Sequence, residues 1–141
     1  MSYSIEKFVL HEHDAQTAGL HYDLRITIPN RDTLASFALP KHEVPRKPGD
    51  KLLAVRTNDH GRMWLNIDHM IIPKGDYGEG VVKTAQRGVC EIEGWSNNYI
   101  TFHIKADDKD LLNGRYALIK FKGSKNGDRD NLWIFLKTRQ Q

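Results

Sequence analysis

Two histidines and an aspartate near the start of the chain have the side chains of a metal site. His13, His21 and Asp23 supply two imidazoles and one carboxylate. This set suits a divalent first-row metal ion that keeps positions open for water and substrate. Alternate side chains of a β-strand share a face, so a strand over residues 20–28 places His21, Asp23 and Arg25 on one side. Arg25 then presents a planar guanidinium that matches a pair of phosphate oxygens, which favours a metal ion beside a phosphate site.

Three further residues extend this chemistry. In a strand over residues 7–13, His11 shares a face with His13, which makes His11 an alternative metal ligand. His60 follows an apolar strand in an expected loop, where an imidazole suits proton donation or the stabilisation of a phosphoryl group. Lys41 ends an apolar run with a cationic point charge. His60 and Lys41 are therefore candidates for contact with phosphate.

A purely structural interpretation of the same residues stays open at this level. His21, Asp23 and Arg25 also fit the solvated face of an amphipathic strand with a surface ion pair. His11 fits a polar position on an edge strand, and His60 fits an exposed turn. Short motifs have weak specificity, so periodicity alone does not choose between the two interpretations.

The composition indicates one globular domain over residues 1–141. With 39% hydrophobic and 28% charged residues, the chain can build one core of normal size, which excludes a disordered or fibrous protein. The net charge of +3 gives a mild preference for anionic partners such as nucleic acid. The single cysteine, Cys90, excludes an intrachain disulfide framework and a cysteine-based zinc site. Neither a signal peptide nor a run of about 18 apolar residues is found, so we expect a cytoplasmic protein without a membrane partner.

Alternating apolar and polar residues between Gly, Pro and Asn turns predict an all-β protein with little helix. So many short strands favour a small β-barrel, closed or partly open, with Trp133 and Cys90 in its core. Residues 75–80 are rich in glycine but are followed by neither Gly-Lys-Ser/Thr nor a helix, so they predict a tight turn. The expected strands span residues 7–13, 20–28, 34–39, 51–57, 63–68, 80–86, 89–95, 99–105, 114–122 and 132–137.

Seven short motifs follow one another through nearly the whole chain. They are Phe8-Val9 leading to His13, HYDLR at 21–25, SFALPK at 36–41, LAVRTNDH at 53–60, IPKGDYG at 72–78, GRYAL at 114–118 and LWIFLK at 132–137. Each motif is weak alone, but their order and spacing together are specific. The chain resembles the 3'-phosphoesterase domain of bacterial DNA ligase D and its free-standing archaeal and bacterial relatives.

This resemblance implies a small β-barrel with a polar active-site cavity and a manganese-dependent activity in DNA repair and end joining. Enzymes of the family remove a terminal ribonucleoside to leave a 3'-phosphate, then hydrolyse that phosphate to a 3'-hydroxyl for ligation. The implied cofactor is Mn²⁺, with Co²⁺ or Zn²⁺ as alternatives, and the implied substrates are DNA 3' ends. Because the chain lacks ligase and polymerase modules, we expect a separate ligase and polymerase as partners, in a nucleoid-associated setting.

The resemblance also implies a role for each matching residue. The implied metal ligands are His13, His21 and Asp23, the implied catalytic residues are Arg25 and His60 with Lys41 as a supporting cation, and the implied substrate-binding residues are Arg25, His60, Asn58 and Trp64.

Three positions depart from the family pattern. His13 and His21 are eight positions apart, where the family has six, so residues 14–20 are expected to bulge, and His11 remains a substitute ligand. Asn58 stands where the ligase-linked enzymes usually carry glutamate, and Trp64 where tyrosine is common. These last two departures bear on removal of the ribonucleoside more than on removal of the phosphate.

Two other functions remain alternatives. The His-x-His pattern of His11 and His13 also fits a cupin-like iron oxygenase, although the glutamate that usually follows it in cupins is missing. A non-catalytic β-barrel that binds nucleic-acid ends is the other alternative. Its basic groove would be formed by Lys120, Lys122, Lys125, Lys137 and Arg139.

Overall fold

The structure, a computed structural model, describes residues 4–121 and 131–139 and is almost entirely β. Over these residues, nine strands and one 3-10 helix form the regular elements, which confirms the all-β prediction. No helix among them has the length and apolar character needed to cross a membrane. The elements are β1 (Ser4–Ala15), β2 (Gly19–Thr27), β3 (Thr33–Leu39), β4 (Lys51–Gly61), η1 (Arg62–Asn66), β5 (His69–Ile72), β6 (Gly80–Trp95), β7 (Tyr99–Ile104), β8 (Gly114–Lys120) and β9 (Leu132–Lys137).

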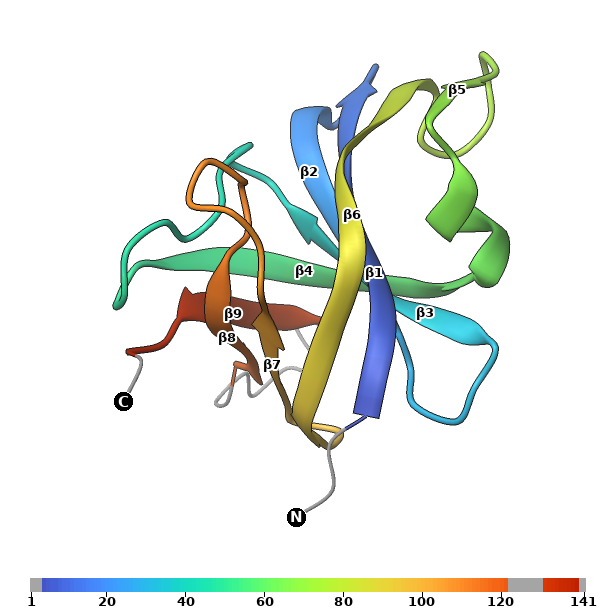
Figure 1. Cartoon of the computed structure of the whole chain (residues 1–141). Coiled ribbons are helices and arrows are strands. Elements are labelled where there is room, and N and C mark those ends of the chain that lie inside the picture. The colour runs from blue at the N-terminus through green and yellow to red at the C-terminus, as the bar shows by residue number, and fades with distance from the viewer. Residues whose placement is uncertain (1–3, 122–130, 140–141) are drawn as a thin grey trace.

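Eight of the strands close into a ring of antiparallel, hydrogen-bonded neighbours (Figure 1). The order around the ring is β1-β2-β3-β4-β9-β8-β7-β6, and β6 pairs again with β1. β5 lies outside the ring and pairs with the first residues of β6. The ring agrees with the prediction of a small β-barrel, closed or partly open.

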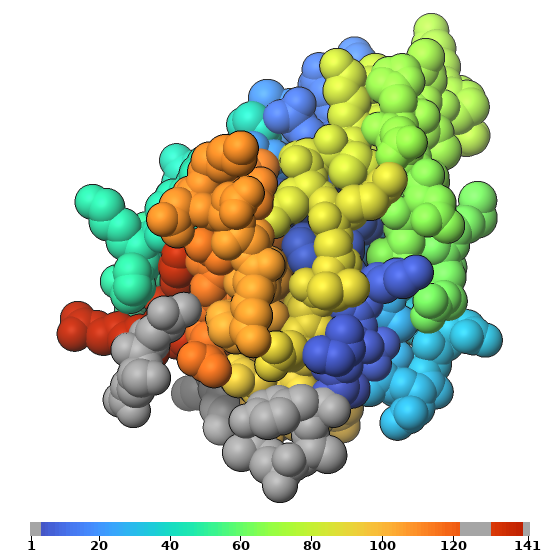
Figure 2. Space-filling model, viewed as in Figure 1, coloured from blue at the N-terminus to red at the C-terminus, as the bar shows by residue number. Residues whose placement is uncertain are grey.

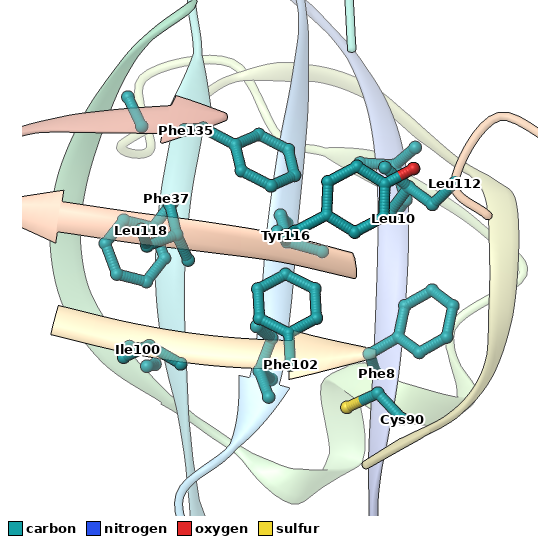
Figure 3. Close-up of a cluster of buried hydrophobic side chains, with 14 of the residues drawn as sticks. Phe8, Leu10, Phe37, Cys90, Ile100, Phe102, Leu112, Tyr116, Leu118 and Phe135 are labelled. Atoms are coloured by element: carbon teal, nitrogen blue, oxygen red, sulfur yellow. The ribbon is translucent and has the colours of Figure 1, made fainter. Parts of the chain in front are cut away.

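The apolar core fills the inside of this ring. Because side chains alternate along a strand, Phe8 of β1 and Leu24 of β2 point inward and their neighbours in sequence point outward. Figure 3 shows this cluster, in which the Phe102 and Tyr116 rings stack with their centroids 5.6 Å apart. Trp133 and Cys90 are buried in the core, as predicted. Burial raises the pKa of the Cys90 thiol to about 12, so this cysteine is an unreactive packing residue.

One segment between β4 and β6 departs from the expected pattern. The prediction of a strand over residues 63–68 is wrong, because η1 and the start of the link to β5 occupy this range. Leu65 packs with Val9 and Leu34 in a second, smaller cluster, and Trp64 packs against the same cluster. The consecutive residues Trp64 and Leu65 therefore both face the sheet. A helical turn permits this, whereas the side chains of a strand alternate between its two faces.

The expected strands over residues 80–86 and 89–95 are a single strand, β6. Arg87 and Gly88, between the two predicted segments, stay in the ladder opposite Val9 and Phe8 of β1. The local sequence lowers strand propensity at Gly88, but pairing with β1 continues through it. The strand expected over residues 114–122 ends at Lys120, and residue 122 lies outside the described residues.

The segment from η1 through β5 to residue 79 covers the outer face of β1 and β2. It forms one flank of the molecule, in green at the right of Figures 1 and 2. The carbonyl oxygen of Ile67 in this segment accepts hydrogen bonds from His11 Nε2 (3.2 Å), Thr84 Oγ1 and Arg87 Nη2 (3.3 Å). These bonds fasten the covering segment to β1 and β6. The predicted polar cavity therefore lies outside the ring, between its outer face and this cover.

Candidate active site and metal centre

The pairing of β1 with β2 brings the predicted metal ligands together. His13 and His21 are direct partners in this ladder. Two residues further along each strand, Asp23 pairs with His11. The expected bulge over residues 14–20 is wrong, because the register continues without a shift to the last pair, Ala15 with Gly19. The hairpin therefore continues in regular pairs beyond the histidines and leaves the histidine pair in place.

The three side chains form a compact buried triad. His13 Nδ1 lies 3.1 Å from Asp23 Oδ2, and His21 Nε2 lies 3.2 Å from Asp23 Oδ1. One ligand atom from each residue falls within 4.8 Å of the other two, and all three residues are buried. Tertiary structure thus gathers two imidazole nitrogens and one carboxylate around a common point, as metal coordination requires.

Each histidine of the triad has a hydrogen-bond acceptor at both ring nitrogens. His13 Nε2 donates to the carbonyl oxygen of Gly78 at 2.8 Å. His21 Nδ1 donates to the carbonyl oxygen of Gly19 at 2.9 Å. A neutral imidazole carries one proton, so the remaining nitrogen of each ring presents a lone pair to the Asp23 carboxylate. The two lone pairs and the negative carboxylate repel one another, so a positive charge is needed between them.

Protons or a metal ion can supply that charge. Burial alone raises the pKa of Asp23, but hydrogen bonds from His13 and His21 and the charge of Arg25 outweigh burial and hold it well below its usual range. Burial lowers the pKa of His21, but the hydrogen bond and charge of Asp23 outweigh this effect and raise it. The carboxylate is therefore ionised at physiological pH and attracts a cation. The donor set fits a divalent metal ion, with the Gly19 and Gly78 carbonyls orienting the two imidazoles.

Arg25 lies next to the triad and is itself buried, at 4% exposure. Its Nη2 is 3.6 Å from Asp23 Oδ2, and its Nη1 donates to His11 Nδ1 at 2.8 Å. The guanidinium carbon lies 4.6 Å from the centre of the Trp64 ring, within the range of a cation–π contact. Contacts on three sides therefore fix the orientation of a buried positive charge.

His11 takes part in holding Arg25 rather than in the triad. Its Nε2 donates to the Ile67 carbonyl oxygen, which leaves Nδ1 to accept from Arg25. Burial, together with the charge of Arg25, lowers the pKa of His11 to about 4, so the ring is neutral at physiological pH. The group of residues whose ligand atoms converge consists of His13, His21 and Asp23, whereas His11 faces Arg25.

A cavity of about 1000 Å³ opens between the ring and its cover. One wall is polar and carries the triad, Arg25 and His60. The opposite wall is formed by residues 70–73 and 75–79. Its apolar side chains, Ile71, Ile72 and Tyr77, form the apolar wall, and Asp76 and Glu79 of the same segment add two carboxylates. The space is larger than a phosphate group requires.

The other predicted site residues lie at different distances from this centre. Asn58, His60 and Trp64 all line the cavity. The prediction of a loop at His60 is wrong, because His60 belongs to β4 and pairs with Leu34 of β3. His60 Nδ1 donates to the Asn58 carbonyl oxygen at 2.7 Å, and the His60 ring meets the Trp64 ring edge-on at 5.1 Å between centroids. Burial and the nearby Arg25 charge lower the pKa of His60. Lys41 is exposed in the turn after β3 and does not line the cavity.

Comparison with known proteins connects this geometry to a family. A family model described as the DNA ligase D 3'-phosphoesterase domain matches residues 11–120. The chain belongs to this family. The matched range contains the triad, Arg25, His60 and the entire covering segment, which confirms the resemblance found in the sequence motifs. As a DNA ligase D 3'-phosphoesterase domain, the chain is assigned to the hydrolases.

A curated relative agrees with this assignment. The multifunctional non-homologous end joining protein LigD of Mycolicibacterium smegmatis is 38% identical over 130 residues. The match covers 84% of this chain and 16% of the relative. The phosphoesterase domain thus corresponds to about one sixth of a much longer protein.

The sequence did not reveal two backbone groups of this phosphoesterase site, the Gly19 and Gly78 carbonyls. Gly78 lies in the glycine-rich turn predicted from residues 75–80, which the structure confirms as a turn. Its φ of +79° favours glycine, and an added Cβ would lie 3.3 Å from His13 Cε1. The only feature of the sequence that pointed to Gly78 was the glycine itself, which suggests a backbone with positive φ. The partner of its carbonyl is 65 residues away in the chain.

Gly78→Ala is expected to weaken metal affinity by about 10-fold or more, the scale reported for loss of a group that orients a metal ligand. The new methyl group strains the turn and pushes the carbonyl away from His13 Nε2. Titration calorimetry with Mn²⁺ measures the effect. Gly75→Ala is the matched control, because Gly75 has a φ of +90° in the same turn but open space around its Cβ position. Equal losses in both variants would contradict a specific role of Gly78.

Proposed function

We propose that this chain is a metal-dependent phosphoesterase that heals DNA 3' ends in end joining. As a 3'-ribonucleoside phosphodiesterase it removes a terminal ribonucleoside, and as a 3'-phosphomonoesterase it converts the remaining 3'-phosphate to a 3'-hydroxyl. The observation that carries the proposal is the buried triad of His13, His21 and Asp23 beside the buried Arg25, in a chain of the phosphoesterase family. The name of the Mycolicibacterium relative, a non-homologous end joining protein, supports the cellular setting.

Mn²⁺ is the proposed ion, held by His13 Nδ1, His21 Nε2 and the carboxylate of Asp23. Mixed nitrogen and oxygen ligands suit Mn²⁺ and also accept Co²⁺ or Zn²⁺. When bound, such an ion supplies Lewis-acid stabilisation of charge on a phosphoryl group and makes bound water more acidic. The residues around the ion carry the remaining roles.

Arg25 binds the phosphate and stabilises the charge that develops on it. Its guanidinium is oriented by His11, Trp64 and Asp23 before substrate arrives, so little reorganisation is needed. The planar fork matches two phosphate oxygens. Burial strengthens this interaction because water does not screen it.

His60 is the proposed proton donor to the leaving oxygen. Its lowered pKa keeps the free imidazole largely neutral near pH 7, with the Nδ1 proton donated to the Asn58 carbonyl. A bound phosphate places negative charge beside the ring, which raises the pKa of His60 and favours protonation at Nε2. Nε2 can then give its proton to the departing hydroxyl group. Trp64 holds the His60 ring edge-on in this position.

The test uses two primer–template DNAs that share one sequence. One primer ends in a single 3' ribonucleotide and the other in a 3'-phosphate, and each is incubated with the protein and Mn²⁺. Conversion of both primers to a 3'-hydroxyl is the expected result. Turnover of the phosphate alone would restrict the function to a phosphomonoesterase. Tight, salt-sensitive DNA binding without turnover of either primer would contradict the proposal and favour a module that only binds nucleic-acid ends.

The proposed partners are DNA 3' ends and separate enzymes for the neighbouring steps. A ligase would consume the 3'-hydroxyl, and a polymerase would add or extend the 3' terminus. Addition of a ligase and a 5'-phosphorylated downstream strand to the assay above should give a joined product only after the 3'-phosphate has been removed.

A further inference from the structure

The apolar wall of the cavity has no role in phosphate chemistry. Tyr77 lines the cavity and is 95% exposed, and Ile71 of β5 lines it at 68% exposure. An aromatic side chain with so little protein contact contributes almost nothing to folding by burial. A phosphate group also has no use for it, because phosphate is recognised by charge and hydrogen bonds.

The backbone of this wall is tied firmly to the metal centre. The residue after Tyr77 is Gly78, whose carbonyl oxygen accepts from His13 Nε2 at 2.8 Å. The next carbonyl, of Glu79, accepts from the Gln16 backbone N–H at 2.8 Å. The Cβ position of Gly78 lies 3.6 Å from Ile72 Cδ1, which brings β5 against the same turn. The backbone that carries Tyr77 is therefore held next to His13 of the triad.

The other aromatic side chain of the cavity is already engaged. The Trp64 ring has the Arg25 guanidinium at 4.6 Å and the His60 ring at 5.1 Å. A base that stacked on this face would have to displace Arg25 from its position. The ring of Tyr77, in contrast, is free on nearly all of its surface.

We propose that Tyr77, with Ile71 of β5 lining the same cavity, is the stacking surface for the nucleobase of the 3'-terminal nucleotide. This inference rests on the proposed function and names the part of the substrate that the apolar wall binds. A phosphate held at Arg25 leaves its attached nucleoside within the same cavity, opposite the polar wall. Stacking on an aromatic ring is tolerant of sequence, since every base has a π face. The enzyme should therefore require a terminal base without preferring one of the four.

The test compares two oligonucleotides that end in a 3'-phosphate. One has a normal terminal nucleotide, and the other has an abasic residue at that position. Wild-type protein should process the normal end with a kcat/KM about 10-fold higher, within the range that loss of one stacked base produces. Tyr77→Ala should lose this preference by slowing only on the normal end, mainly through KM. Tyr77→Phe keeps the ring and should behave as wild type.

Two outcomes would overturn the inference. The first is an equal loss by Tyr77→Ala on both ends, which would indicate a structural effect of the substitution. The second is no loss on either end. Manganese affinity, measured for each variant, checks that the His13 contact with the neighbouring Gly78 is intact.

A binding measurement separates this inference from the proposed function. Fluorescence anisotropy with the same two oligonucleotides and Mn²⁺ reports affinity whether or not the ends are hydrolysed. If wild-type protein hydrolyses neither end, the proposed function fails. Tighter binding of the normal end that is lost in Tyr77→Ala would still support the stacking surface. Equal binding of both ends by wild-type protein would refute the stacking surface even if hydrolysis is rapid.

Discussion

Asp23→Asn is expected to abolish phosphate release, with a loss of at least about 1000-fold in kcat/KM, and to remove measurable manganese binding. Asp23 contacts His13, His21 and Arg25, so its charge joins the metal site to the phosphate site. Asparagine keeps the shape of the side chain but removes the charge that attracts the cation. Phosphate release and calorimetric titration with Mn²⁺ measure the two effects.

A second variant separates loss of metal from loss of fold. Asp23→Asn leaves Arg25 buried without its anionic partner, which can destabilise the domain. His21→Ala keeps the pair of Asp23 and Arg25 and is expected to lose metal binding and activity to the same extent. Asp32→Asn, in the exposed turn between β2 and β3, is the matched control for removal of a carboxylate. Full activity in a folded His21→Ala protein would show that the triad is not the metal site.

Arg25→Lys is expected to lower kcat/KM by about 100-fold while manganese affinity stays close to that of the wild type. Lysine keeps a positive charge near Asp23 but has no planar fork to serve His11 and two phosphate oxygens together. It also loses the flat contact with Trp64. Steady-state kinetics on a 3'-phosphate end and titration with Mn²⁺ distinguish the two properties.

The control for this substitution is Arg31→Lys, at an exposed position in the turn after β2. It makes the same chemical change away from the cavity and should leave both kinetics and metal affinity unchanged. A fall in manganese affinity as large as the fall in kcat/KM would argue against a role of Arg25 on the phosphate. Arg25 would then act only by supporting Asp23.

The sequence alone determined which side chains share a face. Successive residues of a strand point to opposite sides, so residues 20–28 had to place His21, Asp23 and Arg25 together and Leu24 with the core. The continuous apolar run at 132–135 indicated that Trp133 is buried, and alternation along the chain identified the all-β class. These properties depend on neighbours within a few residues, and local backbone geometry is sufficient to derive them.

The tertiary structure decided how that reactive face is used. Only the closed ring shows that the face points outward, and only the packing of Leu65 on Val9 and Leu34 shows why η1 replaces the strand expected at residues 63–68. His11 and His13 are equivalent in the alternating pattern. Arg25 engages one of them, and the triad includes the other.

The physical reason for this division is the distance along the chain between the groups that meet. The Gly78 carbonyl orients His13 across 65 positions, and the Ile67 carbonyl holds His11 across 56. Such contacts form when strand pairing and burial together provide hydrogen bonds and close packing for the whole chain. The residues next to each group in sequence do not indicate which distant group it will meet. The sequence therefore shows which side chains can do chemistry. Only the folded chain shows that His13 joins the triad while His11 holds Arg25, and that Lys41 lies outside the cavity.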